Sequence, residues 1–305
     1  MNRIVFIGVL TVALCVSGLL VKGQALQDSV RPGRLRGVVL TESISYSMTM
    51  AGLYQLWYKD EGLSSFRFFN DNRNWLLMDK AGHATTSYYV GYAGMEVLRW
   101  AGLDRKKAMW YGAPLGLAFL TSVEVFDGFS EDWGFSWGDA LANSGGTALL
   151  MAQELAWQEQ RMLLKFSYAP TEFANYVPNV LGSSWNERIL KDYNGQTYWL
   201  SVNPASFASK GAKIPQWLNV AIGYGATGMT SGSSADIREV WVDGRWQRFT
   251  RRRQAYLSLD IDLTRIPSKR QWVKTALGSI GFLKVPMPAL EWREGKGLLF
   301  RPLFF

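Results

Sequence analysis

The chain has 305 residues, of which 48% are hydrophobic and 19% charged, and its formal net charge is +8. This composition excludes a long disordered protein and predicts a folded chain of one large or two modest domains. The one cysteine, Cys15, excludes a disulfide framework, and the one histidine, His83, excludes every metal motif that needs two histidines.

Residues 1–25 have the pattern of a signal peptide. Arg3 precedes an uncharged apolar run over 4–21, and the small residues over 23–25 fit a cleavage site after about Ala25. The alternative is an uncleaved anchor, because the run is just long enough to cross a bilayer. Cys15 lies inside the run without the small residue that precedes a lipidated cysteine, so we expect no lipid anchor there. The segment predicts an exported protein, located in the periplasm or outer membrane of a Gram-negative bacterium.

The rest of the chain is mildly basic, and 14% of the whole sequence is aromatic. Both properties suit an anionic lipid or lipopolysaccharide surface, where aromatic rings and basic groups gather. No basic stretch has the length or the motif of a nucleic-acid-binding module, and export argues against one. We therefore expect a membrane surface or an envelope protein as the partner, and no nucleic acid.

Residues 26–166 are predicted to form a helical domain. Apolar periodicity, interrupted by Gly and Asn/Asp clusters, predicts a bundle of about four helices at about 38–58, 79–101, 104–127 and 137–164. The stretches 84–101 and 108–126 are apolar enough for either buried or lipid-facing helices. A compact domain packed against a membrane is the preferred interpretation, and a membrane-inserted hairpin over 84–126 is the alternative.

Residues 167–305 are predicted to be rich in β-structure. Strands are expected at 196–202, 218–224 and 256–263, with a hairpin of 240–242 and 245–247 around Asp243-Gly244. Apolar and polar residues alternate over 256–263, so one face of that strand is apolar and the other polar. The chain ends in Phe305, and Pro302 is expected to interrupt its last strand. The predicted fold class is α+β, with the helical bundle followed by the β-rich part.

Polar residues recur within the apolar stretch between 79 and 143. They are Asp79, Lys80, His83, Glu124, Asp127, Asp139 and Asn143. Six of them form pairs three or four residues apart, each pair on one helix face: 79 with 83, 124 with 127, and 139 with 143.

If these three helix faces converge, they enclose an imidazole, several carboxylates and an amide. Such a set could tune a carboxylate as an acid or base, or hold a divalent metal. The metal ligands would be His83, Asp79, Glu124 and Asp127. Two alternatives stay open: a structural network that pins the helix packing, and unrelated surface positions. The sequence indicates no other cofactor.

The densest basic cluster follows the predicted hairpin. It consists of Arg245, Arg248, Arg251, Arg252 and Arg253. In an exported protein these side chains could contact lipid phosphates, each exposed basic group being worth about 1 kcal/mol near an anionic surface. The alternative is a solvated hairpin edge, whose charges keep the strands from pairing with other chains.

The polar stretch also carries a family resemblance. Three segments carry it: Asp79-Lys80-Ala81-Gly82-His83, then Glu124-Val125-Phe126-Asp127-Gly128, then 133–139 with Asn143 and Gly146. They resemble the YfiM-like family of predicted periplasmic lipoproteins of unknown function and, more distantly, VanZ-like membrane proteins. The resemblance covers about 75–150 and implies an envelope location and a small helical domain, but no activity.

The longer form of this chain, with 191–199 and the strands after it, resembles extended members of the same family from Bacteroidetes-type bacteria. We therefore expect a cell-envelope protein, most simply a non-enzymatic, membrane-associated structural or interaction protein. One alternative is a metal- or carboxylate-dependent enzyme that acts on a lipid or cell-wall component. Another is an integral outer-membrane protein.

Overall fold

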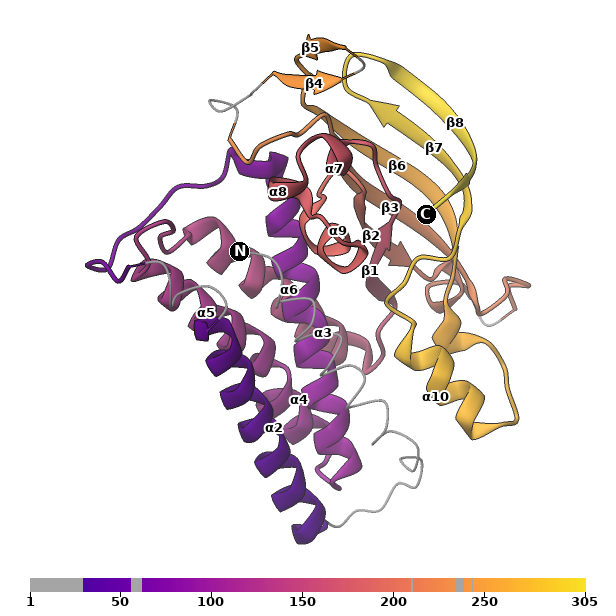
Figure 1. The fold of residues 1–305 in the computed structure, drawn as a ribbon. Helices are drawn as coiled ribbons and strands as arrows, with labels where there is room; N and C mark the ends of the chain where they lie inside the picture. Colours follow the sequence, from indigo (N-terminus) through magenta and orange to yellow (C-terminus); the bar gives the residue numbers. More distant parts are fainter. Residues whose placement is uncertain (1–29, 56–61, 210, 234–238, 243) are drawn as a thin grey trace. The chain divides into compact units, whose positions relative to one another are not determined.

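The computed structural model describes residues 30–55, 62–209, 211–233, 239–242 and 244–305 (Figure 1). The predicted signal peptide and Cys15 lie outside these residues. Helices come first along the chain and most strands follow, which confirms a mixed helix and sheet fold in that order. The arrangement as a bundle of four helices stays a prediction.

The chain divides into two compact units. Unit 1 contains the described residues up to Asp71 and the segment His83–Gln160, and unit 2 contains Asn72–Gly82 and Arg161–Phe305. The long helix that carries His83 therefore begins in unit 2 and continues in unit 1.

The helices of the first half are α2 (Pro32–Leu53), α3 (Met78–Trp100), α4 (Arg105–Gly112), α5 (Pro114–Gly128) and α6 (Trp137–Trp157). The predicted helix at 104–127 is divided into α4 and α5 because Pro114, at the start of α5, has no backbone N–H to donate. The predicted end of the last helix at 164 is wrong. Gln158 adopts a left-handed conformation with φ 54° that ends α6, and a strand begins at Met162.

Two glycines bring α5 and α6 into close contact with the backbone of α3. A Cβ atom placed on Gly146 of α6 would lie 2.0 Å from the carbonyl oxygen of Ala84, and one on Gly116 of α5 would lie 2.0 Å from that of Ser87. Only a residue without a side chain fits at such distances. Because Ala84 follows His83, this contact determines how close α6 comes to the histidine.

Unit 2 contains a six-stranded antiparallel sheet in the order β1-β2-β3-β6-β7-β8. Its strands are β1 (Met162–Tyr168), β2 (Gln196–Val202), β3 (Leu218–Thr227), β6 (Arg252–Ile261), β7 (Met287–Arg293) and β8 (Gly297–Phe304). A separate hairpin pairs β4 (Val240–Val242) with β5 (Arg245–Gln247). Short helices lie between the strands: α7 (Phe173–Tyr176), α8 (Pro178–Leu181), α9 (Trp185–Lys191) and α10 (Gln271–Ser279), with 3-10 turns at Pro204–Ser206 and Leu263–Arg265. A further 3-10 turn, Asn74–Leu77, directly precedes α3.

The predicted strands at 196–202 and 218–224 and the predicted hairpin are confirmed, while the strand predicted at 256–263 begins at Arg252 and ends at Ile261. The expectation that Pro302 interrupts the last strand is wrong, since β8 continues to Phe304. β8 is an edge strand, and its pairing with β7 shifts register between Met287 and Ala289, opposite this proline. A proline is tolerated at such a place because its missing N–H breaks no regular ladder of hydrogen bonds.

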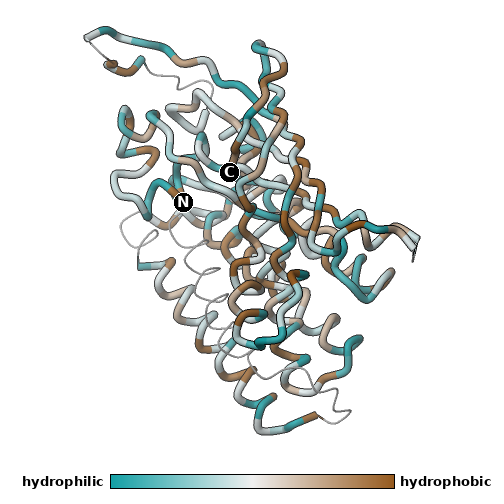
Figure 2. Tube along the Cα trace, turned by 90° about the vertical axis from the view of Figure 1, so that its right-hand side faces the viewer, coloured by the Kyte–Doolittle hydropathy of each residue, from teal (hydrophilic) through white to brown (hydrophobic). Residues whose placement is uncertain are grey.

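On β6 and β7 the sheet exposes apolar side chains and buries polar ones between them. Along β6, Leu257 and Leu259 are exposed at 49% and 45%, whereas Ser258 and Asp260 between them are exposed at 4% and 0%. The buried side of the sheet also carries an apolar cluster of Trp199, Ala221 and Tyr256, and Figure 2 shows hydrophobic residues recurring along the chain. The exposed apolar face, called here the outer face, comprises Val220, Ile222, Leu257, Leu259, Leu290, Trp292, Leu298 and Phe300. A sheet that packs its core in water would show the opposite pattern.

Ion pairs and hydrogen bonds satisfy the polar side chains on the other, inner face. The fully buried Lys165 Nζ lies 2.7 Å from Asp260 Oδ2, which also accepts a hydrogen bond from Ser201 at 2.6 Å. Lys284 Nζ donates to the carbonyl oxygens of Leu259 and Val285, each at 2.8 Å. Burial lowers the pKa of Lys284 to about 8, since the nearby Lys165 charge adds to the desolvation and Asp260 only partly offsets it.

A second buried carboxylate, Glu291, is paired on the same face. It accepts hydrogen bonds from Arg293 Nε at 2.6 Å, Arg301 Nε at 2.7 Å and Gln254 Nε2 at 2.8 Å. Burial alone would raise the pKa of Glu291, but these hydrogen bonds hold it below its usual value. The inner face therefore holds a satisfied polar network.

The contact between α3 and α6 predicts opposite effects for two adjacent glycines. Gly146→Ala should lower the free energy of unfolding by about 2 kcal/mol or more, because its methyl group would overlap the Ala84 carbonyl. Gly145→Ala, where a Cβ meets nothing within 4 Å, should raise it by up to about 1 kcal/mol through helix propensity. Urea denaturation of both variants measures the difference, and equal stabilities would contradict the close contact.

Candidate functional site

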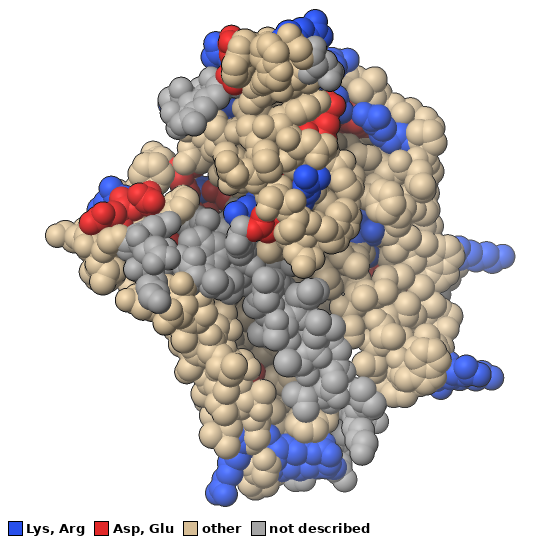
Figure 3. Space-filling model, in the orientation of Figure 1, with Lys and Arg blue, Asp and Glu red and all other residues tan. Residues whose placement is uncertain are grey.

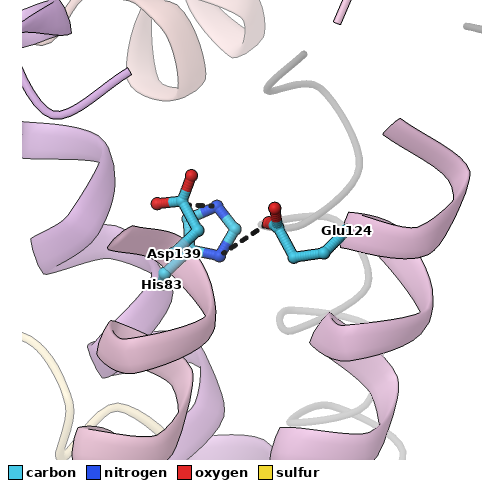
Figure 4. A group of neighbouring side chains, drawn as sticks. All are labelled: His83, Glu124 and Asp139. Carbon is cyan, nitrogen blue, oxygen red and sulfur yellow. Dashed lines mark ion pairs between the residues drawn. The ribbon is translucent and has the colours of Figure 1, made fainter. Parts of the chain in front are cut away.

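His83 lies between two carboxylates in the interior of unit 1 (Figure 4). The imidazole comes from α3, Glu124 from α5 and Asp139 from α6. Its Nδ1 atom lies 3.7 Å from Glu124 Oε1, and its Nε2 atom lies 3.8 Å from Asp139 Oδ1. All three side chains are buried, with His83 the most exposed at 8%. The predicted convergence of these three helix faces therefore takes place around the histidine.

Asn143 determines which imidazole nitrogen carries a hydrogen. Its Oδ1 atom lies 3.1 Å from His83 Nδ1, and because an amide oxygen only accepts, Nδ1 donates this hydrogen bond. The Nε2 atom is then the nitrogen that faces Asp139, available to bind a proton or a cation. The side chain of Asn143 is fully buried, and one turn along α6 the pair Ser87–Thr147 continues the polar contact between α3 and α6 at 2.8 Å.

Ser136, the N-cap of α6, connects the start of this helix to α5. Its hydroxyl accepts a hydrogen bond from the backbone N–H of Asp139 at 3.1 Å and donates one to Asp71 at 2.6 Å. Its own N–H donates to Glu124 Oε2 at 3.1 Å. One capping residue thus orients the carboxyl of Glu124 and fixes the backbone of Asp139.

The buried carboxyl of Glu124 is harder to ionise than an exposed one. Burial raises the pKa of its carboxyl to about 8, the charges of Asp139 and Asp127 raise it further, and the charge of His83 and the hydrogen bond from Ser136 only partly oppose them. Such a carboxyl can deliver a proton at neutral pH, or exchange it for a cation.

Three other candidate residues, Asp127, Asp79 and Lys80, also lie on α5 and α3. Asp127 is buried one turn after Glu124 on α5. Asp79 and Lys80 lie in the first turn of α3, in the segment that belongs to unit 2, and form an ion pair of 3.0 Å. Their predicted role as site residues stays a prediction.

The arginine cluster does not present a uniform surface. Arg245 and Arg248 are exposed. Arg251 Nη2 donates to the carbonyl oxygen of Gly232 at 3.0 Å, and Arg252 Nη1 donates to that of Glu294 at 2.6 Å. Arg253 is exposed, and its backbone N–H donates to Glu294 Oε2. Contact of these arginines with lipid phosphates stays a prediction.

An apolar cavity of about 530 Å³ in unit 1, which the sequence does not predict, is lined by α2, α3 and α5. Glu42 of α2 lies in its wall, and burial raises the pKa of this carboxyl to about 7. In the sequence, Glu42 is the only charged residue between Arg36 and Lys59. This pattern does not by itself predict a buried acid, because a single acid on a helix normally faces water.

Comparison with known proteins finds one related family. Residues 60–153 match the family described as "Predicted periplasmic lipoprotein (DUF2279)". This match supports a periplasmic location and a family of unknown function, and it covers every residue of the group around His83. No curated protein and no solved structure matches the chain. Within the described residues, no helix combines the length and the hydropathy that a membrane span requires.

The carboxyl of Glu42 predicts a pH dependence of stability. Its pKa is about 7 in the folded protein and near 4.5 in the unfolded chain, so stability should fall as the pH rises from about 4.5 to 7 and then level off. Glu42→Gln should remove this part of the decline, which urea denaturation at pH 5 and pH 8 measures. Glu96→Gln is the matched control, because Glu96 already pairs with Arg99 at 2.7 Å and should leave the decline unchanged. An unchanged decline in Glu42→Gln would contradict burial of this acid.

Proposed function

We propose that this protein is an envelope protein that binds to a membrane through the outer face of its six-stranded sheet. The observation that carries the proposal is the exposed apolar face of that sheet, whose residues on β6 and β7 alternate with buried polar ones such as Ser258, Asp260 and Glu291. Apolar surface gains about 25 cal/mol for each Å² removed from water, so a face of this extent favours an apolar environment.

The paired charges on the inner face explain why the sheet exposes the apolar side chains of its other face. Lys165, Asp260 and Glu291 are fully paired there, and turning them toward lipid would leave charges in hydrocarbon. Since side chains alternate along a strand, the apolar residues between them must point outward. The outer face is therefore a consistent feature of the fold and not a local irregularity.

Three properties favour lipid over a protein partner. The apolar residues of the outer face follow one another across β3, β6, β7 and β8, and the exposed Arg253 alternates with them at the start of β6. Figure 3 shows Lys and Arg side chains dispersed over a largely uncharged surface. The two central strands, β3 and β6, have 10 residues each, a length comparable with the strands that face membrane hydrocarbon. The chain is basic, which complements anionic lipid.

The proposed contact is one of the outer face with lipid and does not require the sheet to cross the membrane. β8 has no partner strand on its outer side among the described strands, so the backbone groups of that edge need water or another partner. The alternative of an enzyme that acts on a lipid or cell-wall component would depend on the group around His83, and it stays a prediction.

The test is flotation of the purified full chain with vesicles of phosphatidylethanolamine and phosphatidylglycerol. The wild-type protein should float with the vesicles, and Leu257→Lys, at the centre of the outer face opposite Ile222 and Leu290, should float at least about tenfold less, because a buried lysine costs about 2–4 kcal/mol in hydrocarbon. Leu141→Lys is the matched control, since Leu141 is a 71% exposed leucine of α6 in unit 1, and it should float like the wild type.

Equal flotation of Leu257→Lys and the wild type would overturn the proposal. So would a wild-type protein that stays off the vesicles but forms a dimer that Leu257→Lys dissociates. That second result would identify the outer face as an interface between copies of the chain.

A further inference from the structure

We propose that His83, Glu124 and Asp139 bind one divalent transition-metal ion, of the zinc or manganese class. One ligand atom from each of the three residues lies within 4.8 Å of the other two. They come from α3, α5 and α6, so the ion would connect three helices of unit 1. The inference concerns unit 1 alone and does not depend on the membrane-binding face of unit 2.

The first support is the balance of charge. Glu124 and Asp139 are exposed at 1% and 0%, Asp127 is buried one turn away, and the ion pairs of both Glu124 and Asp139 with His83 are long, at 3.7 and 3.8 Å. Buried carboxylates are normally paired, hydrogen-bonded or bound to a metal, and a cation beside Glu124 Oε1 would be such a partner at the centre of the group.

The second support is independent of charge and concerns hydrogen bonds. The buried Glu124 Oε1 atom, which points toward the imidazole in Figure 4, makes no hydrogen bond. The buried Asn143 Nδ2 atom makes none either. Glu124 Oε1 thus lacks a hydrogen-bond donor, and Asn143 Nδ2 lacks an acceptor. One ion explains both, if it binds the carboxylate and carries a water molecule that accepts a hydrogen bond from the amide.

The surrounding hydrogen bonds already have the form that metal ligands require. Metal-binding histidines usually donate their second ring N–H to a neighbouring group, which fixes the ring and leaves the other nitrogen to the metal. Here Nδ1 donates to Asn143, and Nε2 faces the carboxylate of Asp139. Likewise the N–H of Ser136 donates a hydrogen bond to Glu124 Oε2, so that Oε1 is the oxygen directed toward His83.

The ligand set indicates the class of ion. An imidazole suits zinc and other transition metals, and carboxylates also suit manganese, whereas calcium and magnesium favour oxygen alone. Three protein ligands leave at least one coordination position open, which is typical of catalytic sites and not of closed structural ones. A site of this kind could bind water or an oxygen atom of a substrate.

The test is titration calorimetry of the full chain, stripped of metal with a chelator, against Zn²⁺ and Mn²⁺ separately. The wild-type protein should bind one equivalent of at least one ion, and its melting temperature should rise. Glu124→Gln, which keeps the shape of the side chain, should bind at least about tenfold more weakly while its circular dichroism spectrum stays unchanged. Glu154→Gln is the matched control, because Glu154 is a buried acid of α6 that pairs with Arg105 away from this group, and it should bind like the wild type.

A spectroscopic measurement tests the histidine separately. Co²⁺ bound to the wild-type protein should give visible absorption bands, and His83→Gln should lose them or shift them. If Glu124→Gln does not fold, Asp139→Asn replaces it in the calorimetry. The proposal is overturned if the wild-type protein binds neither Zn²⁺ nor Mn²⁺ saturably, or if the folded variants bind as tightly as the wild type. In that case the group is a structural network between helices.

Discussion

Both units depend on the pairing of buried charges, because an unpaired charge in a protein interior costs several kcal/mol. In unit 2, Lys165 and Asp260 form such a pair. Each partner is fully buried, the two atoms lie 2.7 Å apart, and Ser201 completes the contacts of the carboxylate. This interaction connects β1 with β6, which are three positions apart in the sheet. It therefore determines which side of every strand between them faces inward.

The outer face follows from that choice. Once Asp260 and Ser258 point inward, their neighbours Leu257 and Leu259 have to point outward, and the register of the sheet extends the same choice to β3 and β7. The apolar side chains of the outer face cost free energy when they are exposed to water, so an apolar environment stabilises this sheet. The proposed membrane binding is thus linked to the interior polar network through the alternation of side chains along each strand.

In unit 1 the pairing of buried polar groups is less complete. Gly146 and Gly116 let α6 and α5 approach the backbone of α3, and Ser136 binds the carboxyl of Glu124 and the backbone N–H of Asp139. Yet Glu124 Oε1 and Asn143 Nδ2 make no hydrogen bond, whereas the carboxylates of the inner face of the sheet are satisfied. The ion proposed for this group, together with a water molecule bound to it, would supply the partners that these two atoms lack.

The sequence by itself determined the order of helices and strands, the strand at 196–202, the hairpin, and the three polar pairs on helix faces, because these depend on residues close together in the chain. It also showed the alternation over 256–263, but not which side is buried. Only the tertiary structure decided that, since the answer depends on Lys165, which lies far away in sequence. Likewise spacing placed His83 and Glu124 on helix faces, but the contact of Gly146 with Ala84 and the cap at Ser136, both between distant segments, decided that the faces meet.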